Sequence, residues 1–115
     1  MILTPEEWVR QNTVQFLVQE KKYSKSAINT ELIVELNGMK KRADIIVFKQ
    51  EKPFIIVECK SPSVAISQET FDQIARYNLQ MDADFLMVSN GINHYYCQMD
   101  FENQRYLFLK ELPKK

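Results

Sequence analysis

Two carboxylates and a lysine lie on neighbouring hydrophobic stretches of the chain. Asp44 lies in RADIIVFK (42–49), and Glu58 and Lys60 come at the end of FIIVECK (54–60). β-Branched and aromatic residues dominate both stretches, so we expect two buried strands. Because side chains alternate along a strand, Glu58 and Lys60 point the same way, roughly 6–7 Å apart. Charged groups at the tip of a core strand are unfavourable unless they pair, bind an ion or reach water.

Hairpin pairing of these strands would bring Asp44 beside Glu58, with Ile46 and Phe48 on the same face as Asp44. Two carboxylates at such a short separation repel each other, and desolvation raises the pKa of one of them. A divalent cation removes this conflict, and oxygen ligands at about 2.1 Å suit Mg²⁺, for which Mn²⁺ can substitute. Such an ion polarises a phosphoryl oxygen and lowers the pKa of a bound water, while Lys60 could orient that water or stabilise developing charge. The pattern therefore predicts a phosphodiesterase site.

A simpler interpretation of the same residues is an ion pair. Lys60 could pair with Glu58 or with Asp44 and cap the strand end without any catalytic role. A basic run, residues 40–42, precedes Asp44. Arg42 is the nearest of these residues to the predicted site, so it is the best candidate for a contact with a DNA phosphate.

These residues need a framework to hold them, and the first part of it is an N-terminal helix. TPEE (Thr4 to Glu7) predicts a helix start, with Thr4 as N-cap, Pro5 at the first helical position and Glu7 closing a capping box. The helix is expected to continue to about Glu20. Its expected inner stripe is Val9, Thr13, Phe16 and Leu17.

Six strands and a second helix follow from the pattern of apolar runs and turn signals. NGMK (37–40) is a hairpin signal, and Ser67 is expected to cap a helix from about Gln68 to Met81. The expected strands cover residues 31–36, 42–49, 54–60, 84–90, 93–99 and 104–110. The order αβββαβββ, with a crossover helix between the third and fourth strands, implies an α/β fold: a mixed central sheet flanked by helices, with a parallel pair inside it.

Composition limits the classes of protein to which the chain can belong. Its 115 residues (1–115) form one domain, and its formal net charge is zero, whereas a protein that only wraps nucleic acid would be more basic. Cys59 and Cys97 lie in strand-like stretches without metal-binding spacing and are interpreted as reduced core thiols. No apolar run is long enough to span a membrane and no signal-peptide pattern is present, so we expect a cytoplasmic protein.

A resemblance to a nuclease family rests on several of these stretches together. Asp44, thirteen intervening residues and Glu58-Cys59-Lys60 resemble the PD-(D/E)xK pattern, with Ala43 in place of the proline. QIARY (73–77) resembles the QxxxY helix signature of the RecB-like branch. The chain is most similar to the N-terminal nuclease domain of type I restriction enzyme R subunits. The matching stretches, in the family's order, are PEEWVRQ (5–11), KKRADIIVF (40–48), IIVECKSP (55–62), QIARYN (73–78) and VSNG (88–91).

The resemblance implies a restriction-endonuclease-like fold, DNA as substrate and Mg²⁺ as cofactor, with Asp44, Glu58 and Lys60 as catalytic residues. Family members also place a glutamate on the first helix, facing the metal. Glu6 and Glu7 compete for this role. Glu6 shares the inner stripe of the helix, whereas Glu7 is occupied by the capping box, so Glu6 is the expected third metal ligand.

The second helix also acquires a role from the resemblance. Gln73 and Tyr77 lie four residues apart and share one edge of that helix. Similarity to the RecB-like branch implies that both face the active site and hold DNA or the catalytic lysine. The ordinary alternative is a half-buried packing role for Tyr77 and a solvated position for Gln73.

Two functions remain open. The first is a Mg²⁺-dependent endonuclease that cuts DNA together with other restriction-modification subunits or a helicase motor; the chain itself lacks the G-x-x-x-x-G-K-[ST] stretch of such a motor. The second is a catalytically silent module that keeps the fold and binds nucleic acid or a partner subunit. Retention of the Asp, Glu and Lys set favours the first, because a binding module has no use for carboxylates that repel DNA.

Overall fold

The computed structural model describes residues 4–36 and 38–115 as two α-helices, a short 3₁₀ helix and one six-stranded sheet. The helices are α1 (Pro5–Gln19) and α2 (Gln68–Met81), and the 3₁₀ helix η1 (Lys25–Ala27) leads into the sheet. The strands are β1 (Ile28–Leu36), β2 (Met39–Lys49), β3 (Lys52–Cys59), β4 (Phe85–Ser89), β5 (His94–Asp100) and β6 (Arg105–Leu109). The predicted pair of helices and six strands is therefore confirmed.

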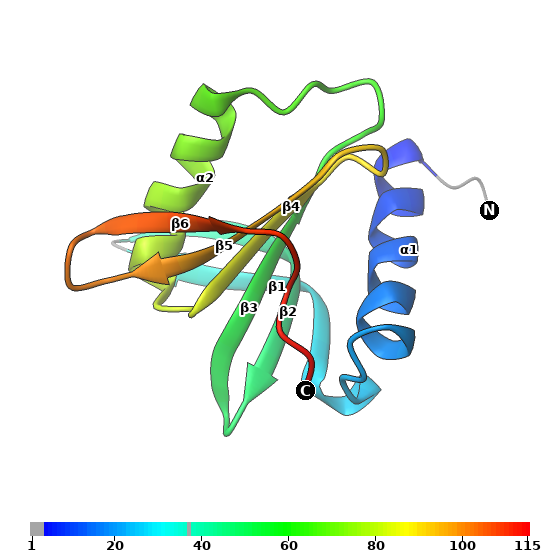
Figure 1. Cartoon of the computed structure of the whole chain (residues 1–115), viewed down its shortest axis with the longest axis horizontal. Helices are drawn as coiled ribbons and strands as arrows, with labels where there is room; N and C mark the ends of the chain where they lie inside the picture. Colours follow the sequence, from blue (N-terminus) through cyan, green and yellow to red (C-terminus); the bar gives the residue numbers. More distant parts are fainter. Residues whose placement is uncertain (1–3, 37) are drawn as a thin grey trace.

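Strand order in the sheet follows the chain, from β1 at one edge to β6 at the other. β3 and β4 are parallel, whereas every other neighbouring pair is antiparallel. The parallel pair requires a crossover, and α2 supplies it. The two helices lie on opposite sides of the sheet (Figure 1). The predicted mixed sheet with an internal parallel pair is thus confirmed.

Side-chain alternation divides the core into two clusters, one under each helix. Under α1 lie the faces of β2 and β3 that carry Ile45 and Val57, together with Cys59, as the alternation predicts. Under α2 lie Ile46 and Ile56. The inner stripe of α1 is buried at Val9, Thr13 and Leu17, but its fourth predicted member, Phe16, is only partly buried.

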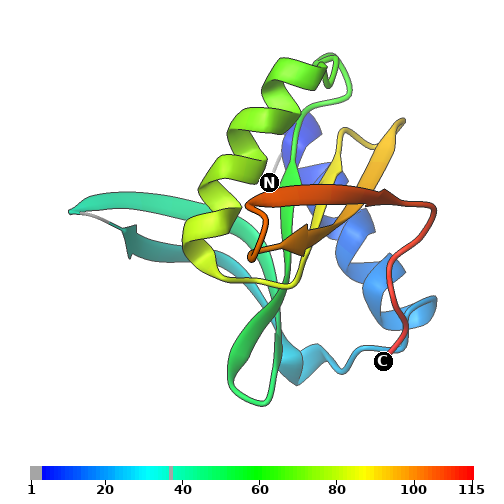
Figure 2. The ribbon, with the colours of Figure 1, turned by 60° about the vertical axis from the view of Figure 1, so that its left-hand side comes forward.

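The β1–β2 hairpin extends past the body of the protein as a two-stranded arm (Figure 2). β1 begins at Ile28 and β2 at Met39, three residues earlier than predicted in each case, and Leu36 pairs with Met39 across the turn. The prediction was too short because backbone hydrogen bonds continue into polar residues that carry no apolar signal. Asn37, in the predicted turn, lies outside the described residues.

The capping box at the start of α1 is only half formed. The Thr4 hydroxyl accepts a hydrogen bond from the Glu7 backbone N–H at 3.1 Å, as predicted. The Glu7 carboxylate does not return to Thr4. It accepts hydrogen bonds from Arg10 and Gln11 instead, because both lie one turn further along the helix.

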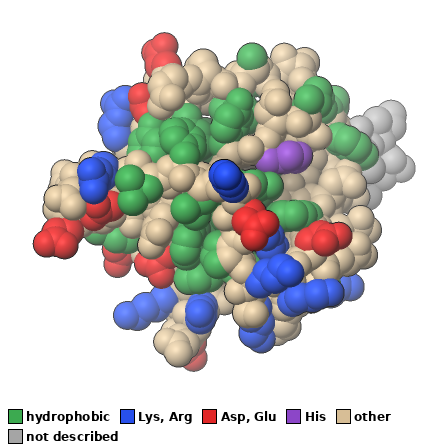
Figure 3. Space-filling model, in the orientation of Figure 1, with side chains coloured by type: hydrophobic (Ala, Val, Ile, Leu, Met, Phe, Trp, Pro, Cys, Tyr) green, Lys and Arg blue, Asp and Glu red, His purple; other side chains and the backbone are tan. Residues whose placement is uncertain are grey.

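Both cysteines are free and buried, as expected for core thiols. Neither described helix is long and apolar enough to cross a membrane. The edge strand β6 carries two half-exposed apolar side chains, Leu107 and Phe108, and hydrophobic side chains are visible on the surface over α2 and β6 (Figure 3).

Two glycines allow a first test of the packing. Gly38 and Gly91 both have positive φ, at +78° and +87°. A Cβ on Gly38 would meet nothing within 4 Å, whereas one on Gly91 would lie 3.0 Å from Cζ3 of Trp8. We therefore expect Gly38→Ala to cost about 1–2 kcal/mol of unfolding free energy from backbone strain alone, and Gly91→Ala to cost more. Urea unfolding of both variants measures the difference, and equal losses would contradict the close packing of Trp8 on Gly91.

Candidate active site

The candidate site lies where β2 and β3 separate. Their last backbone pair next to the site is Ile45 with Val57, so Asp44 and Glu58 are the next residues of the two strands. Asp44 is only 8% exposed, and its Oδ2 accepts a hydrogen bond from the Cys59 backbone N–H at 2.8 Å. The Asp44 carboxylate thus accepts a hydrogen bond that a backbone carbonyl of a neighbouring strand would otherwise accept. This bond fixes the carboxylate against β3.

Asp44 does not lie on the face of Ile46 and Phe48, and that part of the prediction was wrong. Ala43 joins the core cluster of Ile46 instead, and Asp44 lines a cavity beside α1. At this point the β1–β2 pairing is irregular: Glu31 has a positive φ of 55°, and the backbone pairing skips Glu31 and Asp44.

The cavity beside Asp44 has a volume of about 250 Å³ and an acidic lining. It is lined by Thr4, Glu6, Glu7, Arg10, Glu31, Arg42, Asp44 and Cys59. Arg10 forms ion pairs with both Glu7 and Glu31. The hydrogen bond from Arg10 lowers the pKa of the Glu7 carboxyl. Two carboxylates that line the cavity, Glu6 and Asp44, therefore have no arginine partner within the described part of the chain.

The choice between Glu6 and Glu7 gains support from this arrangement. Glu7 is held by Arg10 and Gln11, whereas Glu6 makes no hydrogen bond or ion pair with any residue whose position is described. A carboxylate without a protein partner that lines a cavity remains available to a ligand. Glu6 is the better placed of the two.

The buried Cys59 thiol is within the electrostatic influence of three carboxylates. Burial raises the pKa of Cys59 to about 12, and the negative charges of Asp44, Glu58 and Glu6 contribute to that rise. These are the three metal ligands predicted from the sequence. Even so, no group of three or more metal-binding side chains lies close enough to hold an ion among residues 4–36 and 38–115. Asp44 and Glu6 share the acidic cavity, whereas Glu58 does not line it, so the structure does not arrange the three carboxylates as a closed metal site.

Lys60 lies just beyond the end of β3, half buried. Its backbone N–H donates to the Ser89 carbonyl at 2.8 Å, and its Nζ lies 3.5 Å from Oε1 of Glu58. Of the two ion pairs considered from the sequence, the one with Glu58 is therefore formed. Both side chains remain in contact with solvent, at 32% and 15% exposure, so a pair of this kind contributes about 0–1 kcal/mol. Neither residue lines the acidic cavity.

The predicted DNA-contacting residues are divided between two places. Arg42 is exposed and lines the acidic cavity. Gln73 is exposed on α2 and does not line this cavity. Tyr77 belongs to α2, but its side chain lies outside the described part of the structure.

Sequence reasoning missed two residues of the cavity, Arg10 and Glu31. Arg10 could have been found, because it lies three residues after Glu7 and such pairs meet on a helix surface. Glu31 carried no signal, since its place in the site depends on a positive φ within a strand.

Comparison with known proteins agrees with this architecture. A family model described as type I restriction enzyme R protein N terminus matches residues 5–113. A solved structure assigned as a fragment of an HsdR subunit of a type I restriction enzyme from Vibrio vulnificus YJ016 superposes with a TM-score of 0.65 at 18% identity. The match covers 99% of this chain and 24% of that one, so this chain spans about a quarter of its relative. No curated protein matches the chain significantly. Since the family model covers nearly the whole sequence, the chain belongs to the family of type I restriction enzyme R protein N termini.

Proposed function

We propose that this chain is a Mg²⁺-dependent DNA endonuclease domain with the chemistry of the RecB-like PD-(D/E)xK nucleases, acting in the cytoplasm as part of a type I restriction system. One observation carries the proposal. The buried Asp44 carboxylate is fixed by the Cys59 backbone N–H, in the segment that also holds Glu58 and Lys60. A carboxylate held in this way is preorganised for a ligand rather than left to solvent.

The donor set fits Mg²⁺. This ion is bound through one or two carboxylates and keeps several waters, so it does not require a closed protein cage. Asp44, Glu6 and Glu58 would hold it, and Mn²⁺ would accept the same oxygen ligands. When bound, the ion polarises a phosphoryl oxygen and lowers the pKa of a coordinated water.

Asp44 and Lys60 would have separate roles in the reaction. Asp44 stays oriented because its Oδ2 is occupied by the Cys59 N–H. The Lys60 ammonium lies beyond the strand end, partly solvated, where it can donate a hydrogen bond to an attacking water or to a phosphate oxygen. In hydrolysis, a water oxygen bonds to phosphorus and loses a proton to solvent, the ester P–O bond breaks, and the leaving oxygen takes up a proton. Charge that develops on the phosphate oxygens would be stabilised by Lys60.

Contacts to the DNA backbone would come from Arg42 at the acidic cavity and from Gln73 and Tyr77 on α2. An arginine can donate to a phosphate through two parallel N–H bonds, which fixes position as well as charge. These contacts place the strand without reading its sequence.

A second candidate function is a catalytically silent module that binds nucleic acid or another subunit of the restriction system. One observation favours it: no ready three-ligand metal group occurs within the described residues. The two functions differ in one outcome, namely whether cleavage appears when Mg²⁺ is added.

We expect the isolated chain to nick and cut plasmid DNA slowly, only with Mg²⁺ or Mn²⁺, and without sequence preference. Its net charge is zero, and neither helix is a basic recognition helix. Target choice would therefore come from partner subunits or a motor that position the DNA. Plasmid cleavage with and without metal, followed by sequencing of the cut ends, tests both points. Cut sites confined to one sequence would contradict the second, and no cleavage with either metal would favour the silent module.

A further inference from the structure

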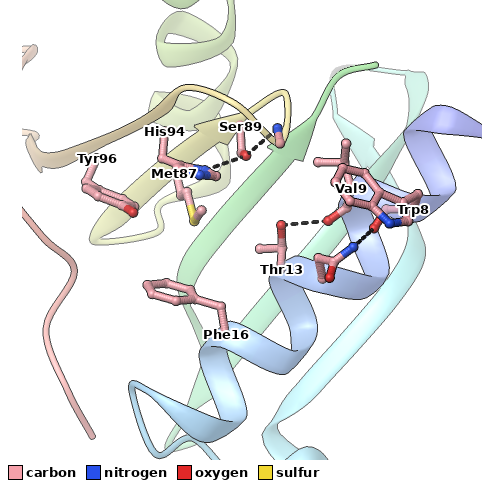
Figure 4. Close-up of a pocket in the computed structure, with 10 residues that line it drawn as sticks. Trp8, Val9, Thr13, Phe16, Met87, Ser89, His94 and Tyr96 are labelled. Carbon is pink, nitrogen blue, oxygen red and sulfur yellow. Dashed lines mark hydrogen bonds between the residues drawn. The ribbon is translucent and has the colours of Figure 1, made fainter. Parts of the chain in front are cut away.

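A second cavity of about 300 Å³ lies between α1 and the strands β4 and β5 (Figure 4). One wall comes from α1 and the other from β4, β5 and the turn between these strands. The lining includes Trp8, Asn12 and Phe16 from α1, and Ser89, His94 and Tyr96 from the strands. None of them is a member of the acidic cavity or of the predicted nuclease site.

The lining of this cavity is aromatic and contains no Asp, Glu, Lys or Arg. Trp8 is 48% exposed, an unusual position for a large indole, and it can approach β4 and β5 closely because Gly91 has no side chain. An exposed aromatic ring beside an open cavity provides a flat surface on which another ring can stack. The absence of charge disfavours a phosphate or a carboxylate as the group that enters.

Polar atoms are placed at the edges of these rings. The Ser89 hydroxyl is hydrogen-bonded to Nδ1 of His94 at 2.7 Å and accepts from the Gly91 backbone N–H at 3.0 Å. This fixes the imidazole and leaves Nε2 for a ligand. The Asn12 side chain donates to the Trp8 carbonyl at 2.8 Å, which leaves its Oδ1 able to accept. The cavity thus offers stacking surfaces with hydrogen-bonding groups at their edges.

We propose that this cavity binds a single nucleobase. A nucleobase is flat, uncharged and carries donors and acceptors on its edge, and the cavity volume lies at the small end of ligand pockets. A base held outside the duplex is bound in this way, by stacking and by edge hydrogen bonds. The exposed residues of α1 from Trp8 to Gln19 are all uncharged, so no carboxylate there repels the phosphates that flank such a base. The identification of this base as part of DNA rests on the proposed function. The expectation that the cavity binds a flat ring rests only on the residues that line it.

Trp8 is the sole tryptophan of the chain, so its fluorescence reports on this cavity alone. Titrations would be run in EDTA, which removes nuclease activity, with adenosine, a single-stranded oligonucleotide and the same sequence as a duplex. We expect saturable quenching by adenosine and by the single strand, and weaker binding of the duplex, in which the bases remain stacked. Saturation by adenosine with no response to the single strand would assign the cavity to free nucleosides or nucleotides instead of DNA bases.

His94→Ala and Asn12→Ala each remove one edge group from the exposed rim of the cavity, and we expect either to weaken binding about fivefold or more. The matched controls are Asn93→Ala, beside His94, and Gln15→Ala, on the exposed face of α1; neither residue lines the cavity. Thermal melts of all four variants establish that they are folded. The proposal is overturned if no ligand gives saturable quenching, or if the controls weaken binding as much as the rim variants. Because no metal is present, these results are independent of whether the chain cleaves DNA.

Discussion

Lys60→Ala is expected to reduce Mg²⁺-dependent cleavage by about 10²–10³-fold, the usual loss when one group that stabilises transition-state charge is removed. The free energy of unfolding should change by no more than about 1 kcal/mol, because Lys60 is partly solvated and its pair with Glu58 is loose, at 3.5 Å. Single-turnover cleavage rates and urea unfolding of the purified variant measure the two effects.

Lys52→Ala is the matched control for this experiment. Lys52 is exposed at the opposite end of the same strand, so its removal changes the net charge equally without touching the site. Cleavage by this variant should equal that of the original chain. If Lys60→Ala retains full cleavage, Lys60 has no part in the mechanism, and its contact with Glu58 is only a surface ion pair.

Asp44→Asn should abolish cleavage while leaving the metal-free protein at least as stable. Asparagine has nearly the same volume, and its side-chain oxygen can still accept the hydrogen bond from the Cys59 N–H. A negative charge in the cavity that Asp44 shares with Glu6 disappears, so the metal-free melting temperature should not fall and could rise. Loss of an anionic ligand should also reduce the stabilisation that Mg²⁺ produces. Thermal melts with and without Mg²⁺ measure both changes.

Comparison of Asp44→Ala with Asp44→Asn separates the effect of the hydrogen bond from that of the charge, because alanine removes both and asparagine removes only the charge. It leaves the buried Cys59 N–H without its acceptor, so we expect a loss of about 1–3 kcal/mol in unfolding free energy that Asp44→Asn does not show. A clear drop in the metal-free melting temperature of Asp44→Asn, together with an unchanged response to Mg²⁺, would contradict the metal-site proposal. That result would mean that the Asp44 charge stabilises the fold by pairing.

Much of the framework could be predicted from the sequence because its signals are local. The N-cap at Thr4, the cap at Ser67 and the span of α2 follow from short-range hydrogen bonding. The crossover between β3 and β4 follows from the length of the connection, and the buried face of Cys59 follows from strict alternation along β3. The sequence also predicted that the strands carrying Asp44 and Glu58 would pair, since two hydrophobic stretches joined by a short loop form a hairpin.

Only the tertiary structure determined where the carboxylate side chains point and which of them form ion pairs. The direction in which Asp44 points is not given by alternation along β2, because Ala43 and Ile46 share one core cluster while Asp44 lines the cavity beside α1. The pairing of Arg10 with Glu31 joins α1 to β1 and therefore depends on the tertiary structure. The aromatic cavity likewise combines Trp8 with His94, residues far apart in the chain whose separate stretches carry no sign of a shared site. Periodicity reports the environment along one element, whereas these contacts arise between elements, where small irregularities in the backbone determine which side chains meet.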